Sequence, residues 1–306
     1  MTGYSRRSFA GLFLALLFPL RRSAVAQQPP APQPKAVEAP PRVQLRHYRA
    51  DAVILFLGIP IIRRSGVGGG RASMEETKDG ASTRTTFQFV AGSDAKRAHG
   101  LNRMGWLREV VLGPIAAPTE ITYFGVMTSS PEESFEHARK TIEGPQAARS
   151  AYSAVSGRHT AGHSQGALTH FEFPSDVSWR DQRLIDEAQS KLRGEVNWRK
   201  DSWPDSASVP HTFLCEMANL LNQHTRHAVG RYIYNEQEYS LELDAAQTGA
   251  GAARLLQVRG KVRNLATGHH TPFQMWMDEA SGSVVPVRID FQPRSYLRLT
   301  FEAAAE

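Results

Sequence analysis

Hydrophobic and polar residues alternate along five segments near the C-terminal end of the chain. These segments are Tyr239–Asp244, Leu256–Arg263, Phe273–Met277, Val285–Gln292 and Leu297–Glu302. Alternation with a period of two places successive side chains on opposite faces of a strand, one buried and one in water. The pattern therefore predicts an antiparallel meander with one wet face.

The chain from about residue 46 to residue 130 is also typical of β-structure. β-branched and aromatic residues predict strands at Tyr48–Leu57, Thr83–Val90, Trp106–Leu112 and Ile121–Met127. The glycine and the proline of Gly58-Ile59-Pro60 predict a bend or bulge directly after the first of these strands.

The middle of the chain combines helices and strands. Helices are predicted at Pro131–Glu143, Asp176–Leu192 and Val209–His224, the first with a proline in its opening turn and Gly144 as its stop. Two strands around a glycine-rich turn are predicted at Tyr152–Ser156 and Gly166–Phe173.

These elements predict the fold class. One-sided strands have to bury their apolar faces, and the helices are the available partners. We therefore expect an α+β fold that is mainly antiparallel β, a curved sheet or half-barrel with helices packed on the concave side. The expected domain covers residues 45–306, with a helical middle section at about 131–228.

Residues 1–26 are typical of an export signal and carry no information on the fold. Arg6 and Arg7 precede the apolar run Phe9–Leu20, and small residues follow up to Ala26. Twelve residues rise only about 18 Å as a helix, short of the ~30 Å core of a bilayer, so a cleaved signal is favoured over a spanning anchor. The SRRSF stretch is similar to the twin-arginine motif, which predicts export of the folded protein to the bacterial periplasm or the medium.

Residues 27–44 are expected to form a proline-rich linker between the signal and the domain. Six prolines occur in Gln27–Pro41, which favours a solvated, semi-rigid spacer. The formal net charge of the chain is +6, and residues 1–26 hold four arginines and no acid. Removing these leaves 32 basic against 30 acidic residues, a net charge of +2. A nucleic-acid partner is therefore not expected, nor is a membrane span after signal cleavage.

The stretch Gly162-His163-Ser164-Gln165-Gly166 fits the G-x-S-x-G pattern of serine hydrolases. A nucleophile elbow follows a buried parallel strand and opens a helix. Here the preceding residues are polar, and Leu168–Pro174 alternates like a strand. Acids and bases that could serve as partners follow it at Asp181, Asp186, Asp205, His211, His224 and His227, but their abundance makes their order uninformative. A polar hairpin turn is favoured over an elbow.

Other chemistry-bearing residues give weaker signals. His159 and His163 have the spacing of a helical metal pair, but the flanking glycines argue against a helix, and the pairs His224/His227 and His269/His270 have no cysteine or carboxylate at ligand spacing. The run Gly66–Gly70 lacks the ending of a phosphate loop, so we expect it to let a strand bend or to allow close approach of the backbone to a ligand. No catalytic, cofactor-binding or metal-binding residue is assigned, and no cofactor is expected.

Cys215 is the single cysteine, so it has no partner for an internal disulfide. It falls away from the apolar stripe of the predicted helix Val209–His224. An inert, semi-buried thiol is favoured, with a nucleophilic or intermolecular thiol as the alternative.

The C-terminal strands also carry a family likeness. Phe273–Asp278, which contains Trp276 and Asp278, and Val284–Ile289, with its Pro-Val-Arg-Ile ending, resemble a bacterial envelope domain family of unknown function. That family is similar in shape to periplasmic lipoprotein carriers. The resemblance implies a curved antiparallel sheet with helices in or over its concave side, and it implies no catalytic residues.

These observations favour an exported, non-catalytic envelope protein that binds a lipid or other hydrophobic ligand in a half-barrel cleft. Met275, Trp276 and Met277 could line such a cleft, although a plain core position is favoured for the two methionines. Two alternatives stay open. One is a structural or protein-interaction module of the cell envelope, and the other is a secreted serine hydrolase that uses the GHSQG stretch.

Overall fold

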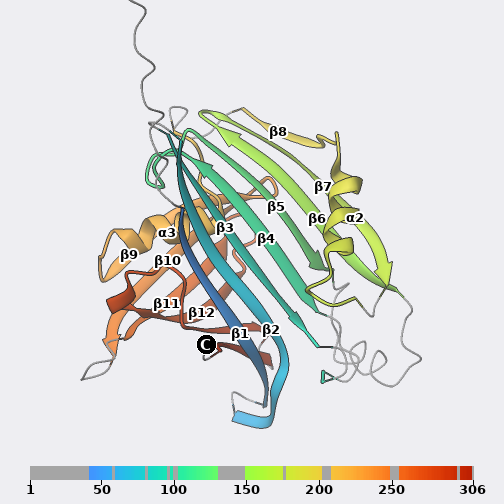
Figure 1. Cartoon of the computed structure of the whole chain (residues 1–306), viewed down its shortest axis with the longest axis vertical. Coiled ribbons are helices and arrows are strands. Elements are labelled where there is room, and N and C mark those ends of the chain that lie inside the picture. The colour runs from blue at the N-terminus through green and yellow to red at the C-terminus, as the bar shows by residue number, and fades with distance from the viewer. Residues whose placement is uncertain are drawn as a thin grey trace, which may run out of the picture. The chain divides into compact units, whose positions relative to one another are not determined.

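The computed structural model describes residues 41–56, 59–79, 82–94, 97–98, 103–129, 149–174, 177–201, 208–248, 255–294 and 297–304 (Figure 1). They all belong to one compact unit, Glu38–Glu306. The predicted export signal, nearly all of the predicted linker and the predicted helix Pro131–Glu143 lie outside the described residues. No helix in the described part of the chain is long and apolar enough to cross a membrane.

In the part of the chain that the structure describes, fourteen antiparallel strands form one sheet, which is curved and not closed. The strands are β1 (Arg42–Phe56), β2 (Ile59–Asp79), β3 (Ser82–Ser93), β4 (Met104–Leu112), β5 (Glu120–Thr128), β6 (Arg149–Thr160), β7 (His163–Pro174), β8 (Trp198–Lys200), β9 (His227–Tyr234), β10 (Gln237–Thr248), β11 (Leu255–Asn264), β12 (His270–Asp278), β13 (Arg288–Arg294) and β14 (Leu297–Ala303). The predicted fold class, α+β and mainly antiparallel β, is confirmed.

The strand order places the first and last strands side by side in the middle of the sheet. The order is β8-β7-β6-β5-β4-β3-β2-β1-β14-β13-β12-β11-β10-β9. Two meanders, β1–β8 and β9–β14, therefore meet where β1 pairs with β14, from Tyr48 opposite Ala303 to Ile54 opposite Leu297.

Curvature brings strands from distant parts of this order into contact. The Lys200 ammonium on β8 donates to the Glu238 carboxylate on β10 over 2.9 Å. The hydroxyl oxygen of Tyr123 on β5 accepts the backbone N–H of Asn235, next to β9, at 3.2 Å, and the rings of Tyr123 and Tyr234 lie 5.1 Å apart. The face of β5 that carries Tyr123 is therefore the concave face.

Among the described residues, two helices pack against the sheet, one on each face. α3 (Phe213–Asn222) lies on the concave side, as predicted, against β4, β9 and β10. α2 (Gln182–Leu192) packs its buried face on Val126 and Ala154, which are paired neighbours on β5 and β6. Because side chains alternate along a strand, Val126 points away from the Tyr123 face, so α2 covers the opposite side of the sheet. The predicted position of the helices on the concave side is therefore correct for α3 and wrong for α2.

The boundaries of several elements differ from the predicted ones. α2 begins at Gln182 rather than near Asp176, because the Asp181 carboxylate accepts the N–H of Arg183 and caps the helix there. The strand β9 was not predicted. β13 begins at Arg288 rather than Val285, whose side chain instead packs in the concave core.

Candidate functional site

The amino end of α3 is held by a carboxylate from the sheet rather than by its own N-cap residue. Thr212 occupies the N-cap but makes no cap hydrogen bond to its helix, and its hydroxyl donates to Glu109 on β4 at 2.5 Å. Glu109 also accepts the backbone N–H groups of Leu214 at 3.0 Å and Cys215 at 2.9 Å. These are two of the N–H groups that a helix leaves without a partner at its amino end.

Glu109 is completely buried, and its pKa reflects two opposed effects. Burial removes water from the carboxylate and raises the pKa to about 7, while the Thr212 hydroxyl and the backbone donors of Leu214 and Cys215 lower it. His211 lowers it further by its charge. Burial has the larger effect, because moving a carboxylate out of water costs more than a few hydrogen bonds return.

A second buried carboxylate lies one turn further along α3. Glu216 is 4% exposed, and its Oε2 contacts the Nδ1 of His211 and accepts the Asn219 side-chain N–H at 3.3 Å. The Glu216 side chain lies directly over Gly230 on β9, where an added Cβ would stand 1.5 Å from Oε1. Only glycine at position 230 leaves room for this carboxylate.

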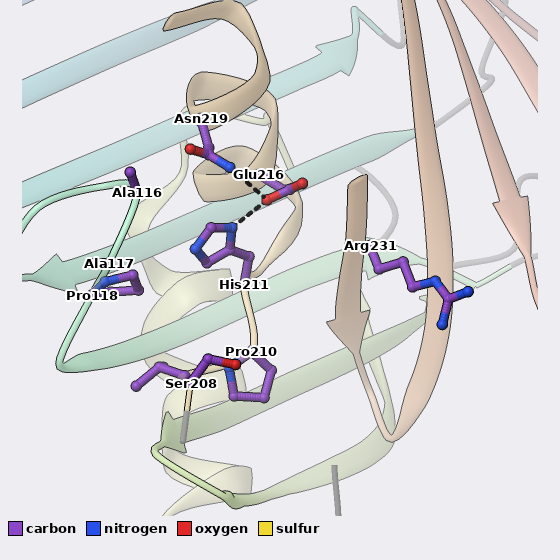
Figure 2. A pocket seen from close by; sticks show the side chains of 10 residues that line it. Ala116, Ala117, Pro118, Ser208, Pro210, His211, Glu216, Asn219 and Arg231 are labelled. Carbon is purple, nitrogen blue, oxygen red and sulfur yellow. Dashed lines mark hydrogen bonds and ion pairs between the residues drawn. The ribbon is translucent and has the colours of Figure 1, made fainter. Parts of the chain in front are cut away.

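These polar groups line a pocket of about 470 Å³ beside the amino end of α3 (Figure 2). Its walls are the loop Ala116–Pro118, the segment Ser208–His211, Glu216 and Asn219 of α3, and Arg231 on β9. Arg231 lies across the pocket from the alanine and proline of the loop (Figure 2). The pocket thus offers an imidazole, a carboxylate and an amide, which suits the polar end of a small molecule, while the guanidinium of Arg231 points away from these groups (Figure 2).

The floor of this pocket is continuous with the apolar core of the concave side. Val209 lines the pocket and is also a member of the buried cluster that contains Tyr48, Phe87, Val111 and other side chains of the sheet. Ile115, next to the loop Ala116–Pro118, packs against the same cluster. A molecule in the pocket would therefore touch polar side chains on one side and the edge of the core on the other.

Ser164 of the G-x-S-x-G stretch does not lie in an elbow, but the prediction of a polar turn is wrong for the serine itself: the turn is at residues 161–162, and Ser164 lies on the buried side of β7. β6 and β7 are antiparallel partners joined by a two-residue turn, with His159 opposite Ser164. Both residues are completely buried, and Ser164 Oγ lies 2.6 Å from His159 Nδ1. Neither residue lines the two pockets described here.

His159 is held in its neutral form. Burial lowers its pKa to about 4, and only the backbone of Ile233 opposes this shift. Its ring stacks on Tyr123 with 5.3 Å between centroids, and its Nε2 has no hydrogen-bond partner among the described residues. A serine–histidine pair is therefore present, but both side chains are completely buried, so a substrate cannot reach it in this structure. Placing the turn at residues 161–162 would have revealed this pair from the sequence.

A smaller pocket of about 300 Å³ lies over β5, β6 and β7. It is lined by Tyr123, Gly157, Arg158 and Glu195, among others. An added Cβ at Gly157 would lie 2.4 Å from the ring of Tyr123, so this glycine lets the ring lie flat on the sheet.

Cys215 is completely buried in the concave core, so the prediction that it lies away from the apolar face of its helix is wrong. Burial raises the pKa of the Cys215 thiol well above its usual range, with further contributions from the charges of Glu109 and Glu216. The helix is shorter than predicted and lies between β4 on one side and β9 and β10 on the other, so Cys215 is not exposed to water. The thiol is unreactive in this state.

The remaining sequence candidates are dispersed. His163 pairs with Asp201 on the surface, while His159 points into the core, so they share no ligand position. The run Gly66–Gly70 lies inside β2, which bends at Gly66 with φ +63° but does not break. His269 and His270 are exposed.

His227 gains neighbours that the sequence did not reveal. It lies opposite Asp244 across the β9–β10 ladder, with Nδ1 2.8 Å from the carboxylate, and Glu242 stands close by. The hydrogen bond to Asp244 raises the pKa of His227. All three side chains are wholly or partly in water, so this is a surface ion pair rather than an enclosed metal site.

Met275 and Met277 are buried in the core cluster between α3 and the C-terminal strands, which is the plain core position that the sequence favours. Trp276 points to the other face of β12, where its ring lies 4.7 Å from the Arg288 guanidinium.

No protein-family model, curated protein or solved structure matches the chain. The geometry of the site is therefore the basis for its functional interpretation.

Proposed function

We propose that this chain is an exported, non-catalytic protein of the bacterial envelope that binds a lipid or another hydrophobic molecule with a polar end. The polar end lies among His211, Glu216 and Asn219, and the apolar part lies along the concave side of the sheet beside α3. This proposal rests on one observation: Val209 lines the polar pocket and is also part of the apolar core on the concave side.

The helix that lies over the concave side of the sheet supports the same interpretation. Two buried apolar clusters extend over both meanders on this side, and the described part of the chain covers them with the ten residues of α3. A ligand whose apolar part lies beside this helix would contact these apolar clusters, which suits a hydrophobic molecule.

The serine hydrolase alternative gains no support from the site. A nucleophile has to reach its substrate, and Ser164 and His159 are both completely buried on paired strands. No observation favours the alternative of a structural module either.

The proposal is tested by extracting the purified protein with organic solvent and identifying released molecules by mass spectrometry. A hydrophobic molecule should co-purify with the native chain. Ala117→Trp, which fills the polar pocket from an exposed loop residue, should reduce its amount at least several-fold. Ala280→Trp, at an exposed position that does not line the pocket, is the matched control and should leave the amount of ligand unchanged.

An empty native protein that also fails to bind a fluorescent fatty acid would overturn the proposal. Equal loss of the ligand in both tryptophan variants would move the binding site away from the pocket.

A further inference from the structure

The outer end of the β1–β2 hairpin extends past its neighbours in the sheet. β2 begins at Ile59, but β3 pairs with it only from Gly68 onward. On the other side, the pairing of β1 with β14 ends at Ile54. In Figure 1 this end of the hairpin, in light blue, projects beyond the adjacent strands.

Apolar side chains on this end are in water. Ile59 is 64% exposed and Ile62 is 44% exposed, and Pro60 between them is exposed as well. We name the set Ile59, Pro60, Ile62, Arg63 and Arg64 the hairpin tip. Large aliphatic side chains close together on a projecting edge indicate a contact surface.

The charge around the tip has one sign. Arg63 and Arg64 follow the apolar residues directly and are both exposed, and neither pairs with an acid in the described part of the chain. From Ala52 to Met74 the sequence contains three arginines and no acidic residue. The nearest acid before this stretch, Asp51, is occupied by the N–H of Gly66 at 2.7 Å and by Arg49.

We propose that the hairpin tip docks on the surface of a membrane that contains anionic lipids. Ile59, Pro60 and Ile62 enter the boundary between headgroups and acyl chains, and Arg63 and Arg64 contact the phosphates. An apolar tip followed directly by arginines matches the order of layers in such a membrane, in which acyl chains lie beneath anionic headgroups. Charge and proline also keep a free strand edge from pairing with other chains, but edge protection does not account for the two exposed isoleucines.

The test measures membrane insertion at the hairpin tip itself. Binding of the whole chain to vesicles would not be sufficient, because the apolar run at residues 9–20 can bind vesicles on its own. The only cysteine, Cys215, is completely buried, so Ile59→Cys can be labelled selectively with an environment-sensitive nitrobenzoxadiazole dye. Val43→Cys is the matched control, since Val43 is 57% exposed on β1 far from the tip.

Vesicles of phosphatidylcholine with 30% phosphatidylglycerol should shift the emission of the dye at position 59 to the blue and leave position 43 unchanged. In the labelled Ile59→Cys chain, the pair Arg63→Gln and Arg64→Gln should raise the lipid concentration for half of this shift by about 30-fold, as expected from losing two headgroup contacts. Arg259→Gln with Arg263→Gln, exposed arginines on β11, should have no effect. Higher salt should weaken the response.

Equal shifts at positions 43 and 59, or no shift at 59, would overturn the proposal. So would a shift that appears without vesicles as the protein concentration rises, which would assign the tip to a second copy of the chain. Pure phosphatidylcholine vesicles that work as well as the anionic ones would remove the role of the arginines. Circular dichroism of each variant checks that the sheet is intact.

Discussion

The Oε2 oxygen of Glu109 on β4 accepts the backbone N–H of Cys215 at 2.9 Å, across 106 positions of sequence. This contact joins the concave face of the first meander to the helix that covers it. Because the carboxylate takes two backbone donors and one hydroxyl, it determines where α3 begins and how it lies on the sheet. The polar pocket at the same end of the helix depends on this placement.

Glu109→Leu should destabilise the protein by at least about 3 kcal/mol. The substitution leaves the donors of Thr212, Leu214 and Cys215 buried without an acceptor, and each such group costs roughly 1–3 kcal/mol. Urea unfolding followed by circular dichroism measures the loss. Glu120→Leu is the control, because Glu120 pairs only with the half-exposed Arg158 on the surface, a pair worth about 1 kcal/mol or less.

Glu109 should also impose a pH dependence on stability. Its folded pKa of about 7 lies above the ordinary value of 4.5, so its contribution is fully present below pH 4.5 and is lost as the pH rises through 7. The difference is on the order of 3 kcal/mol. Glu109→Gln does not titrate, so subtracting its unfolding free energy from that of the native protein should give a curve that falls across this window. A flat difference would contradict the raised pKa.

His159 should act in the opposite direction. Its folded pKa of about 4 lies below the ordinary 6.5, so the stability it contributes is present above pH 6.5 and is lost as the pH falls through 4. Between pH 4 and pH 7, the free energy of unfolding of His159→Gln should change less with pH than that of the native protein. Unfolding curves collected between pH 4 and pH 7 show whether it is.

Gly157→Ala should unfold the protein or cost several kcal/mol, because the new methyl group would overlap the Tyr123 ring, which is itself confined by Tyr234. Gly105→Ala is the control, in strand β4 on the other side of β5, where nothing lies within 4 Å of an added Cβ. That substitution should be neutral or slightly stabilising. Thermal unfolding of both variants separates them, and similar losses would show that the Tyr123 contact is not the reason.

Fluorophosphonate probes should not label the native protein, because Ser164 is completely buried against His159. Ser164→Ala should instead reveal a structural role, losing roughly 1–3 kcal/mol of stability as the imidazole loses its partner. Labelling that disappears in Ser164→Ala would show that the hairpin opens to substrate and would revive the hydrolase alternative.

The sequence predicted most strands because their two faces meet different surroundings. Tyr239, Leu241 and Leu243 alternate with residues in water, and this pattern depends only on local burial. β9 escaped prediction because its pattern breaks at Ile233, which is buried next to the buried Tyr232. The strand touches β5 as well as β10, so it does not have a single wet face.

The candidate site was largely hidden from the sequence for a different reason. Glu109 is one polar residue in an ordinary strand, and His211 and Glu216 lie about a hundred residues later. Their meeting depends on how far the sheet curves, which no local pattern records. The register of the β6–β7 hairpin, by contrast, is short-range, and Ser164 opposite His159 follows from the turn alone.

The ladder between β1 and β14 has a consequence for how the chain acquires its structure. Tyr48 pairs with Ala303, so forming this ladder closes a chain loop that contains strands β2 to β13. The entropy lost on closing this loop opposes pairing until the contacts between β1 and β14 have formed. Each meander can assemble from neighbours in sequence, but the two can merge only after synthesis of the final strand. We therefore expect slow, late joining of two preformed halves, and a ribosome-bound chain that ends before Leu297 should leave β1 as an open, aggregation-prone border.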